Sequence, residues 1–381
     1  MRVSGRVVRA GEVVPAHLEI DGPVIASVSS ADDAGDDVIV PGFVDLHCHG
    51  GGGHTFTTGE VAAARGAAGF HLAHGTTTLL ASMVSSPYPV MRDATTALAP
   101  LVAEGVIAGI HFEGPYLSRD RCGAQNPAYL RDPSLDELRD LLARGAGTVR
   151  VVTLAPELPG ALEAIAMLVE AGVVAALGHT GASYEQTMAA VAKGATLGTH
   201  LFNGMPPPHH REPGPVTALL AAPTAVSELI ADGIHLHPGM LAFAARAAGP
   251  DHTALITDAM DAAGRPDGHY RLGDQDVTVT HRVARLDRDG SIAGSTLTMD
   301  EALRRAVEAG IPLPDACAMA ATTPARVLGL TDRGTLDPGR RADLVVLTPD
   351  LHVKRVMRAG RWLPPSPAGF ASASPLRTTR H

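Results

Sequence analysis

The stretch VIVPGFVDLHCHG (residues 38–50) decides the fold. Its apolar residues form a short run of the kind seen in strands that are buried on both faces, and His47 and His49 come where the run ends. Two histidines that are two positions apart on an extended chain point to the same side. The stretch therefore predicts a buried strand with two imidazoles at its carboxyl end.

Seven further apolar runs follow along the chain. With the first, the runs are 38–47, 76–83, 106–113, 149–156, 173–179, 195–200, 227–235 and 253–260. Helical, alanine-rich segments lie between them, such as SLDELRDLLARG (134–145) and ALEAIAMLVEAG (161–172), each closed by a glycine. Alternation of strand and helix favours a parallel sheet, and eight units predict an α/β protein with a (β/α)8 TIM-like barrel; a doubly wound open sheet is the alternative.

The two ends of the chain have a different pattern, in which apolar and polar residues alternate and Gly and Pro mark the turns. We expect residues 1–40 and 335–365 to pair into a small β-sandwich domain beside a barrel of residues 41–334. Residues 268–294 resemble a β-hairpin inserted before the last helix, 299–310. The tail 366–381, rich in Pro, Ser and Ala, is expected to be mobile.

Composition excludes several classes of function. The 381 residues carry a net charge of −9, so there is no basic excess for binding a nucleic acid backbone. No signal-peptide pattern and no run of 18 apolar residues occurs, so no membrane association is expected. The three cysteines are scattered and contain no CxxC motif, which suits a reducing compartment. These features predict a soluble, cytoplasmic protein.

Ionisable side chains close six of the eight runs. They are His47 and His49, Glu113, His179, His200, His235 and Asp258. Because the carboxyl ends of barrel strands meet on one face, we expect these groups to converge there. A lone histidine is more often an ordinary buried or surface residue, but imidazoles and carboxylates together suit one or two divalent ions, Zn²⁺ first and Fe²⁺, Co²⁺ or Mn²⁺ as alternatives. Such an ion lowers the pKa of bound water to about 7, and Asp258 would then move protons.

The chain contains only two lysines, Lys193 and Lys354, and neither stands at the end of an apolar run. Many two-metal hydrolases bridge their ions with a carbamylated lysine at a strand end, so that arrangement is not expected here. Glu113 is the predicted bridging group. His111, two residues before it, could support a ligand or simply pack.

The segment HLFNGMPPPHHREPG (200–214) joins one of these histidines to an Asn-Gly turn and an arginine. Asn203 and Gly204 could present backbone N–H groups to an anion. Arg211 could clamp a phosphate or carboxylate with two hydrogen bonds. The alternative is an ordinary turn with a solvated arginine.

These motifs resemble the N-acetylglucosamine-6-phosphate deacetylase family of the amidohydrolase superfamily. The matching segments, in family order, are PGFVDLHCHGGGG, HFEGPYLS, GHTGAS, THLFNGMPPPHHREPG, ADGIHLHP, TDAM, AGSTLTM, ATTPARVLGL and GTLDPGRRADLVVL. The segments HFEGP and THLFNGMP are specific to these deacetylases. The resemblance implies hydrolysis of the acetamide of N-acetyl-D-glucosamine 6-phosphate to D-glucosamine 6-phosphate and acetate.

The resemblance also assigns roles to residues. It implies Glu113, His179 and His200 as ligands of the main metal and Asp258 as the catalytic acid/base. The residues that it implies as substrate contacts are Gln125, Asn203, Gly204, Arg211, His235, Ile292, Ala293 and Gly294. It further implies a homodimer in which Arg211 acts across the interface on a small-molecule amino-sugar phosphate.

Some members of this family lack the first pair of histidines and hold one metal, whereas this chain keeps His47 and His49, so a second site is available near Asp258. Three alternatives stay open at this point. The substrate could be N-acetylgalactosamine 6-phosphate or a cyclic amide, or the chain could be a non-catalytic scaffold of the same fold. The missing strand-end lysine and the Arg211 segment count against the cyclic amide, and the full ligand set counts against the scaffold.

Overall fold

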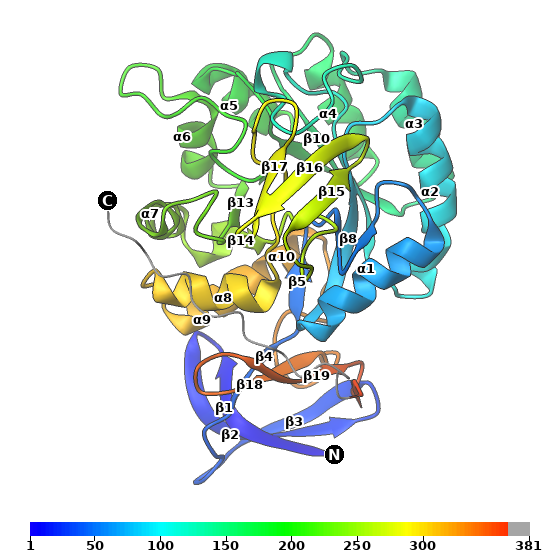
Figure 1. Ribbon diagram of the computed structural model, residues 1–381. Helices are drawn as coiled ribbons and strands as arrows, with labels where there is room; N and C mark the ends of the chain where they lie inside the picture. The colour runs from blue at the N-terminus through cyan, green and yellow to red at the C-terminus, as the bar shows by residue number, and fades with distance from the viewer. Residues whose placement is uncertain (365–381) are drawn as a thin grey trace.

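A computed structural model describes residues 1–364 of the chain, so the tail predicted to be mobile, 366–381, lies outside the described residues. Eight parallel strands form the centre of the molecule, with helices around them (Figure 1). The strands are β5 (Phe43–Asp45), β8 (Thr76–Met83), β9 (Gly109–Glu113), β10 (Val149–Leu154), β11 (Val174–Leu177), β12 (Leu197–Gly198), β13 (Val226–Ile230) and β14 (Thr253–Ile256). The predicted barrel is confirmed, and each of the eight apolar runs contributes one of these strands.

The barrel closes between its first and last strands without a regular ladder. Neighbouring strands follow chain order from β5 to β14. Beyond the ends of these two strands, Cys48 forms a parallel bridge with Ala259, and the N–H of Asp258 donates to the carbonyl of His47 at 2.8 Å. The N–H of His49 donates in turn to the carbonyl of Ala259 at 2.8 Å. The seam therefore joins the segments that carry the predicted ligands.

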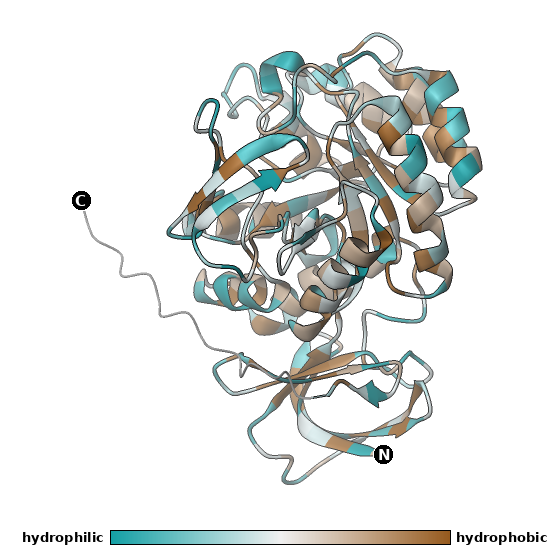
Figure 2. Ribbon diagram, turned by 45° about the vertical axis from the view of Figure 1, so that its right-hand side comes forward, coloured by the Kyte–Doolittle hydropathy of each residue, from teal (hydrophilic) through white to brown (hydrophobic). Residues whose placement is uncertain are grey.

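A helix follows each barrel strand, although short antiparallel strands come first after β5 and after β14. The helices are α1 (Val61–Ala73), α2 (Tyr88–Ala103), α3 (Leu135–Gly145), α4 (Ala161–Glu170), α5 (Tyr184–Ala192), α6 (Gly214–Ala221), α7 (Pro238–Ala248) and α8 (Met299–Glu308), with α9 (Leu313–Cys317) and α10 (Thr323–Val327) after them. The helix 299–310 predicted to be the last is therefore followed by two short ones. Figure 2 shows apolar residues along the strands and polar residues on the outer faces of helices.

Local sequence explains where the helices begin and end. The hydroxyl of Ser134 caps α3 by accepting from the N–H of Glu137, and Ser183 forms a reciprocal capping box with Gln186 on α5. The prediction that Gly145 closes α3 is wrong, because Gly145 is still helical and Ala146 takes the left-handed cap at φ 46°. A Cβ on Gly145 would lie 2.9 Å from Val149, so close packing on β10 explains the glycine there.

The two ends of the chain form one small domain below the barrel (Figure 1). Its strands are β1 (Arg2–Arg9), β2 (Glu12–Asp21), β3 (Val24–Ser30), β4 (Val38–Pro41), β18 (Leu344–Leu347), β19 (Val353–Arg358) and β20 (Arg361–Trp362). They make one continuous sheet in the order β20-β19-β18-β4-β1-β2-β3, in which β4 pairs with both β1 and β18. Side chains from both ends of the chain, such as Leu18 and Leu344, share its core.

The run 38–47, predicted as one strand, is divided at Gly42. Its first part, β4, belongs to the small domain, and its second part, β5, opens the barrel. The N–H of Gly42 donates to the carbonyl of Asp343 at 2.9 Å, and a Cβ on Gly42 would lie 2.4 Å from the hydroxyl of Thr77. Only glycine leaves room for the chain to pass here between the two sheets.

Residues 268–286 form a three-stranded antiparallel sheet where a hairpin was predicted. Its strands are β15 (Gly268–Leu272), β16 (Gln275–Thr280) and β17 (Val283–Leu286). Apolar side chains of this sheet pack on Val84, after β8, and on Met260, after β14. The sheet therefore covers part of the face where the barrel strands end. Within residues 1–364, no helix is both long and apolar enough to cross a membrane.

The close contact at Gly42 generates a stability prediction. Gly42→Ala should lower the free energy of unfolding by about 1–3 kcal/mol, the usual effect of overpacking, because the β-branched Thr77 cannot turn away from the new methyl group. Gly69→Ala is the matched control. Gly69 is exposed on α1 with nothing within 4 Å of the added Cβ, so this change should stabilise by about 0.5–1 kcal/mol. Urea unfolding of both variants measures the difference, and equal effects would contradict the argument.

Candidate metal centre

The predicted ligands converge at the carboxyl end of the barrel. His47 and His49 follow β5, and Glu113 is the last residue of β9. The other three, His179, His200 and Asp258, stand two residues beyond β11, β12 and β14. All six side chains are buried, with none more than about a tenth exposed. The strand ends therefore bring four imidazoles and two carboxylates together.

Glu113, His179 and His200 form the first ligand group. The Nε2 atoms of His179 and His200 lie 3.0 and 2.8 Å from Oε1 of Glu113 and 3.1 Å from each other. Their ligand atoms all lie within 4.8 Å of one another. The three side chains could hold one divalent ion.

His47, His49 and Asp258 form a second group of the same kind. The Nε2 atoms of the two histidines are 3.0 Å apart, and Oδ1 of Asp258 lies 3.5 Å from the first and 3.3 Å from the second. Oε2 of Glu113 lies 3.2 Å from Nε2 of His49. Glu113 therefore faces both groups with different oxygens, as a bridging carboxylate would.

The hydrogen bonds behind the histidines show that this donor set fits a metal. Three of the four Nδ1 atoms face an acceptor: the carbonyl of Arg121 for His179 (2.8 Å), the carbonyl of Ser82 for His49 (3.2 Å) and a carboxylate for His47 (3.2 Å). Nδ1 of His200 has no hydrogen-bond partner among residues 1–364. A neutral imidazole that donates from Nδ1 has its lone pair on Nε2. The Nε2 lone pairs then point at one another, which is favourable when a cation lies between them.

Three of the ligand residues have unusual backbone conformations. His179, His200 and Asp258 have positive φ angles of 47°, 29° and 47°. Residues with a side chain seldom adopt this region, and backbone strain of this kind often occurs where a side chain must point in a fixed direction. The turn after each strand thus directs the ligand back over the barrel.

Charge in the centre is balanced between acids and imidazoles. Burial alone would raise the pKa of Asp258, but the neighbouring imidazoles of His47 and His49 outweigh burial and lower this pKa to about 2. The carboxylate is therefore ionised at neutral pH. His235 donates from Nδ1 to Asp232 at 2.7 Å, and this bond raises the pKa of His235 although burial opposes it.

The chain matches the Amidohydrolase family over residues 38–363. It belongs to the amidohydrolase family. It is 37% identical over 328 residues to the N-acetylglucosamine-6-phosphate deacetylase of Lysinibacillus sphaericus, covering 85% of this chain and 84% of that one. It is 38% identical over 359 residues to the N-acetylgalactosamine-6-phosphate deacetylase of Escherichia coli O157:H7, covering 93% of each.

A solved structure gives a closer comparison for this amidohydrolase. A mutant N-acetyl-D-glucosamine-6-phosphate deacetylase from Mycobacterium smegmatis, in complex with N-acetyl-D-glucosamine-6-phosphate, is 45% identical in sequence. It superposes with a TM-score of 0.92 and covers 95% of this chain and 98% of that one.

The residues predicted to contact substrate are placed at different distances from the ligands. Gln125 donates to Oε2 of Glu113 at 2.6 Å, so it touches a ligand directly. Gly204 packs on His179, since a Cβ there would lie 2.8 Å from Nδ1, and Gly294 packs on the carbonyl of Asp258 in the same way at 3.0 Å. Gly294 ends the Ile292–Ala293–Gly294 stretch after β17.

One prediction for the segment 200–214 differs from the structure, and the role predicted for Arg211 across an interface stays a prediction. The N–H of Asn203 donates to the carbonyl of His200 at 3.0 Å, so it closes a turn and is not free for an anion. Arg211 is exposed on the loop before α6, where it contacts His210 at 2.7 Å, and it does not join the buried groups. Figure 1 shows this green loop projecting from the barrel between α5 and α6.

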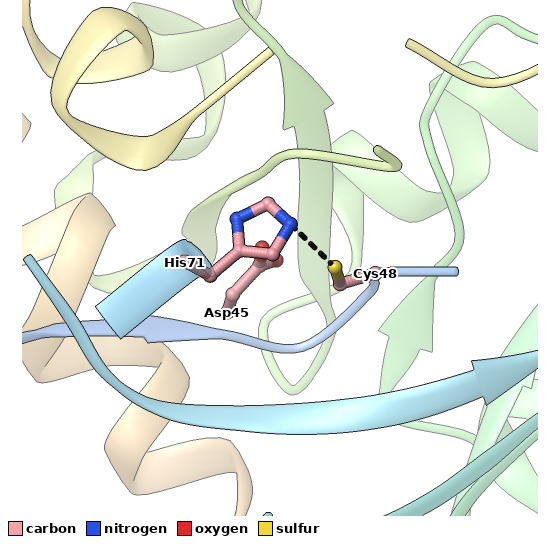
Figure 3. A group of neighbouring side chains, drawn as sticks. All are labelled: Asp45, Cys48 and His71. Atoms are coloured by element: carbon pink, nitrogen blue, oxygen red, sulfur yellow. Dashed lines mark hydrogen bonds between the residues drawn. The ribbon is translucent and has the colours of Figure 1, made fainter. Parts of the chain in front are cut away.

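A third group of potential ligands includes Cys48, which stands between His47 and His49 in the chain. Figure 3 shows Asp45, Cys48 and His71 close together. Nε2 of His71 lies 2.9 Å from the carbonyl of Gly50 and 3.2 Å from the sulfur of Cys48. Burial raises the pKa of the Cys48 thiol and lowers that of His71 to about 4. A neutral thiol beside an imidazole that is already bonded does not favour a metal.

Asp45 has a different role in this amidohydrolase. Its Oδ1 accepts from the N–H groups of His47 and Thr257, both at 3.2 Å, and its Oδ2 accepts from the hydroxyl of Thr257 at 2.6 Å. Asp45 thereby ties the segment after β5 to the segment after β14. It holds His47 and Asp258 in register across the barrel seam.

Sequence reasoning missed the residues that orient the ligands. Glu228 on β13 meets Nδ1 of His47, and Asp232 supports His235. Both carboxylates lie in SELIADGIH (227–235), where Glu228 and Asp232 stand seven and three residues before His235, and an acid inside an otherwise apolar run was the available signal. His111 packs edge-on against His47 with ring centroids 4.5 Å apart and bonds to Ser82 and Thr153 instead of a ligand.

The division into two ligand groups predicts the metal content of variants. Replacing Glu113, His179 or His200 with Ala should abolish activity. The double variant His47→Ala/His49→Ala should lose about one equivalent of metal per chain and keep the ion of the first group. Elemental analysis of purified wild-type and variant protein measures this. The second group is not a metal site if the double variant retains both its metal content and full activity under every metal supplied.

Proposed function

We propose that this amidohydrolase removes the acetyl group of N-acetyl-D-glucosamine 6-phosphate, giving D-glucosamine 6-phosphate and acetate. The observation that carries the proposal is the complete ligand set, Glu113, His179, His200, His47, His49 and Asp258, gathered at one barrel face. The 45% identity and near-complete overlap with a deacetylase bound to this sugar phosphate support the choice of substrate.

The chemistry needs a divalent ion, which Glu113, His179 and His200 would hold, with His47, His49 and Asp258 available for a second. When bound, such an ion polarises the acetyl carbonyl and activates a water molecule. Zn²⁺ suits imidazole and carboxylate ligands, and Fe²⁺, Co²⁺ and Mn²⁺ share these preferences.

Asp258 is the proposed proton carrier of the reaction. It ends the last barrel segment, lies beside both ligand groups and is ionised at neutral pH. Oδ1 or Oδ2 would accept the proton of the attacking water and return it to the leaving amine, so that the amine departs neutral. His235, fixed by its bond to Asp232, would donate to the substrate from the opposite ring nitrogen.

The phosphate requires a cation outside the buried groups. Arg211 is exposed on its loop, which supports a role as a clamp that reaches into the site of a second subunit. We propose a homodimer in which each site borrows this arginine. The free state of Cys48, Cys122 and Cys317 is compatible with the proposed cytoplasmic location.

N-acetyl-D-galactosamine 6-phosphate is the second candidate substrate. The Escherichia coli relative named for it is 38% identical, about as similar as the Lysinibacillus relative named for the glucosamine substrate. The M. smegmatis structure at 45% identity favours the glucosamine sugar. The two sugars differ only at one hydroxyl group, so a side-by-side assay distinguishes them.

Asp258→Asn tests the proton carrier. Asparagine keeps the shape of the side chain but cannot carry a proton, so kcat should fall by at least about 10²-fold while KM changes much less. Metal content at Glu113, His179 and His200 should persist. If the variant keeps more than a tenth of the wild-type kcat with full metal loading, another group moves the proton.

Substrate comparison tests the proposed function. N-acetylglucosamine without phosphate should react far more slowly than its 6-phosphate, because the loss of a charge-assisted bidentate contact costs about 2–3 kcal/mol. The measurement is kcat/KM for both compounds and for the galactosamine 6-phosphate isomer. Equal values with and without phosphate would remove the phosphate site from the proposal.

The same assay tests whether Arg211 acts across an interface. Arg211→Ala and Asp258→Asn chains, each inactive alone, should regain part of the activity when mixed and allowed to exchange subunits. No recovery in demonstrated mixed dimers would place Arg211 in its own site.

A further inference from the structure

Glu228 stands between the two ligand groups without belonging to either of them. It lies on β13, in the middle of the run VSELI, and its side chain is completely buried. Neighbouring strands β12 and β14 carry His200 and Asp258 just beyond their ends. A buried carboxylate at this position needs an explanation, because burying a charge is costly unless partners stabilise it.

One carboxylate oxygen of Glu228 has two partners. Oε2 lies 3.2 Å from Nδ1 of His47 and accepts the backbone N–H of His200 at 3.2 Å. The first partner belongs to the His47, His49 and Asp258 group, and the second belongs to the Glu113, His179 and His200 group. A single oxygen atom thus contacts one residue of each proposed metal site.

The two contacts orient different parts of the ligands. At His47 the carboxylate receives Nδ1–H, which leaves the lone pair on Nε2 facing Glu113 and Asp258. At His200 the carboxylate holds the backbone N–H of a residue with φ 29°, a conformation that needs support from its surroundings. The backbone carbonyl of Glu228 also accepts the N–H of Leu201 at 2.8 Å, so β13 fixes the turn from both sides.

The other oxygen, Oε1, is buried and has no hydrogen-bond partner among residues 1–364. A charged group with one oxygen unsatisfied destabilises the folded chain. A glutamine carbonyl could accept both contacts in place of Oε2 without burying a charge, but as a neutral and therefore weaker acceptor. The structure therefore retains a charge that folding does not require.

We propose that Glu228 is a positioning residue that couples the two metal sites, by fixing the tautomer of His47 and the backbone turn of His200 with the same oxygen atom. Its negative charge increases the electron density that His47 offers to a cation. The inference goes beyond the proposed reaction, because it concerns metal affinity whichever N-acetyl sugar phosphate is hydrolysed. It rests on the assignment of two ligand groups to metals.

Glu228→Gln separates this role from a structural one. We expect the metal-free variant to be as stable as the metal-free wild type or more stable, because a buried charge is removed. We expect the Co²⁺ affinity of both sites to fall about 10- to 100-fold, measured by competition with a chelator. The visible absorption spectrum of the bound Co²⁺ should also change. A role limited to folding would instead lower the stability of the metal-free protein and leave Co²⁺ affinity unchanged.

The variant His47→Ala/His49→Ala distinguishes the two contacts. In this background only the first ligand group is expected to bind, so a further loss of Co²⁺ affinity on adding Glu228→Gln reports the contact with His200. Loss confined to the site of His47 would overturn the coupling. Ser227→Ala is the matched control, since Ser227 is the adjacent buried residue on β13 and its hydroxyl has no partner within residues 1–364. It should leave both affinities unchanged.

Glu228→Asp covers the case in which the glutamine variant does not fold. Aspartate keeps the charge but withdraws the carboxylate from Nδ1 of His47, so Co²⁺ affinity should still fall. If both variants fold and bind Co²⁺ within twofold of wild type, the proposal is wrong. Two equivalents of Co²⁺ in wild-type protein test the underlying site assignment separately, so failure of that assignment is not confused with failure of the inference.

Discussion

The carboxylate of Glu113 lies within 3.0 Å of Nε2 of both His179 and His200, and its second oxygen lies 3.2 Å from Nε2 of His49. This sharing is possible only if three separate strand ends deliver their side chains to the same point. A parallel barrel provides that geometry, because all its strands end on one face. The positive φ angles of His179, His200 and Asp258 are the local cost of turning those side chains inward.

A second layer of polar groups keeps the ligand atoms aimed. The carbonyls of Arg121 and Ser82 and the carboxylate of Glu228 each face an Nδ1 atom, which directs the Nε2 lone pairs toward the centre. Asp45 acts one step further out, because it bonds to backbone N–H groups on both sides of the barrel seam. The positions of the ligand atoms therefore depend on two acids, Glu228 and Asp45, that belong to neither ligand group.

The barrel also depends on glycines at positions where a side chain would not fit. Gly42 lets the chain pass from the small domain into β5, Gly204 lies against His179, and Gly294 lies against the carbonyl of Asp258. In each case an added Cβ would meet a neighbour within about 3.0 Å. These glycines allow the chain to approach closely at the passage from the small domain, at the turn that carries His179 and at the segment that follows the sheet β15–β17.

The sequence by itself determined the eight barrel strands and the six candidate ligand residues that meet at their ends. Apolar runs and the polar residues that close them are local patterns. In a parallel barrel the carboxyl ends of all the strands lie on the same face, so these local patterns also place the polar residues together. The break at Gly42, the third strand of the inserted sheet and the left-handed cap at Ala146 were decided by packing. The contacts of Glu228 were also decided by the tertiary structure, because its partners His47 and His200 lie 181 and 28 residues away in the chain. The local sequence around a buried carboxylate does not indicate which distant residue will contact it. Only the closed barrel brings Glu228, His47 and His200 together.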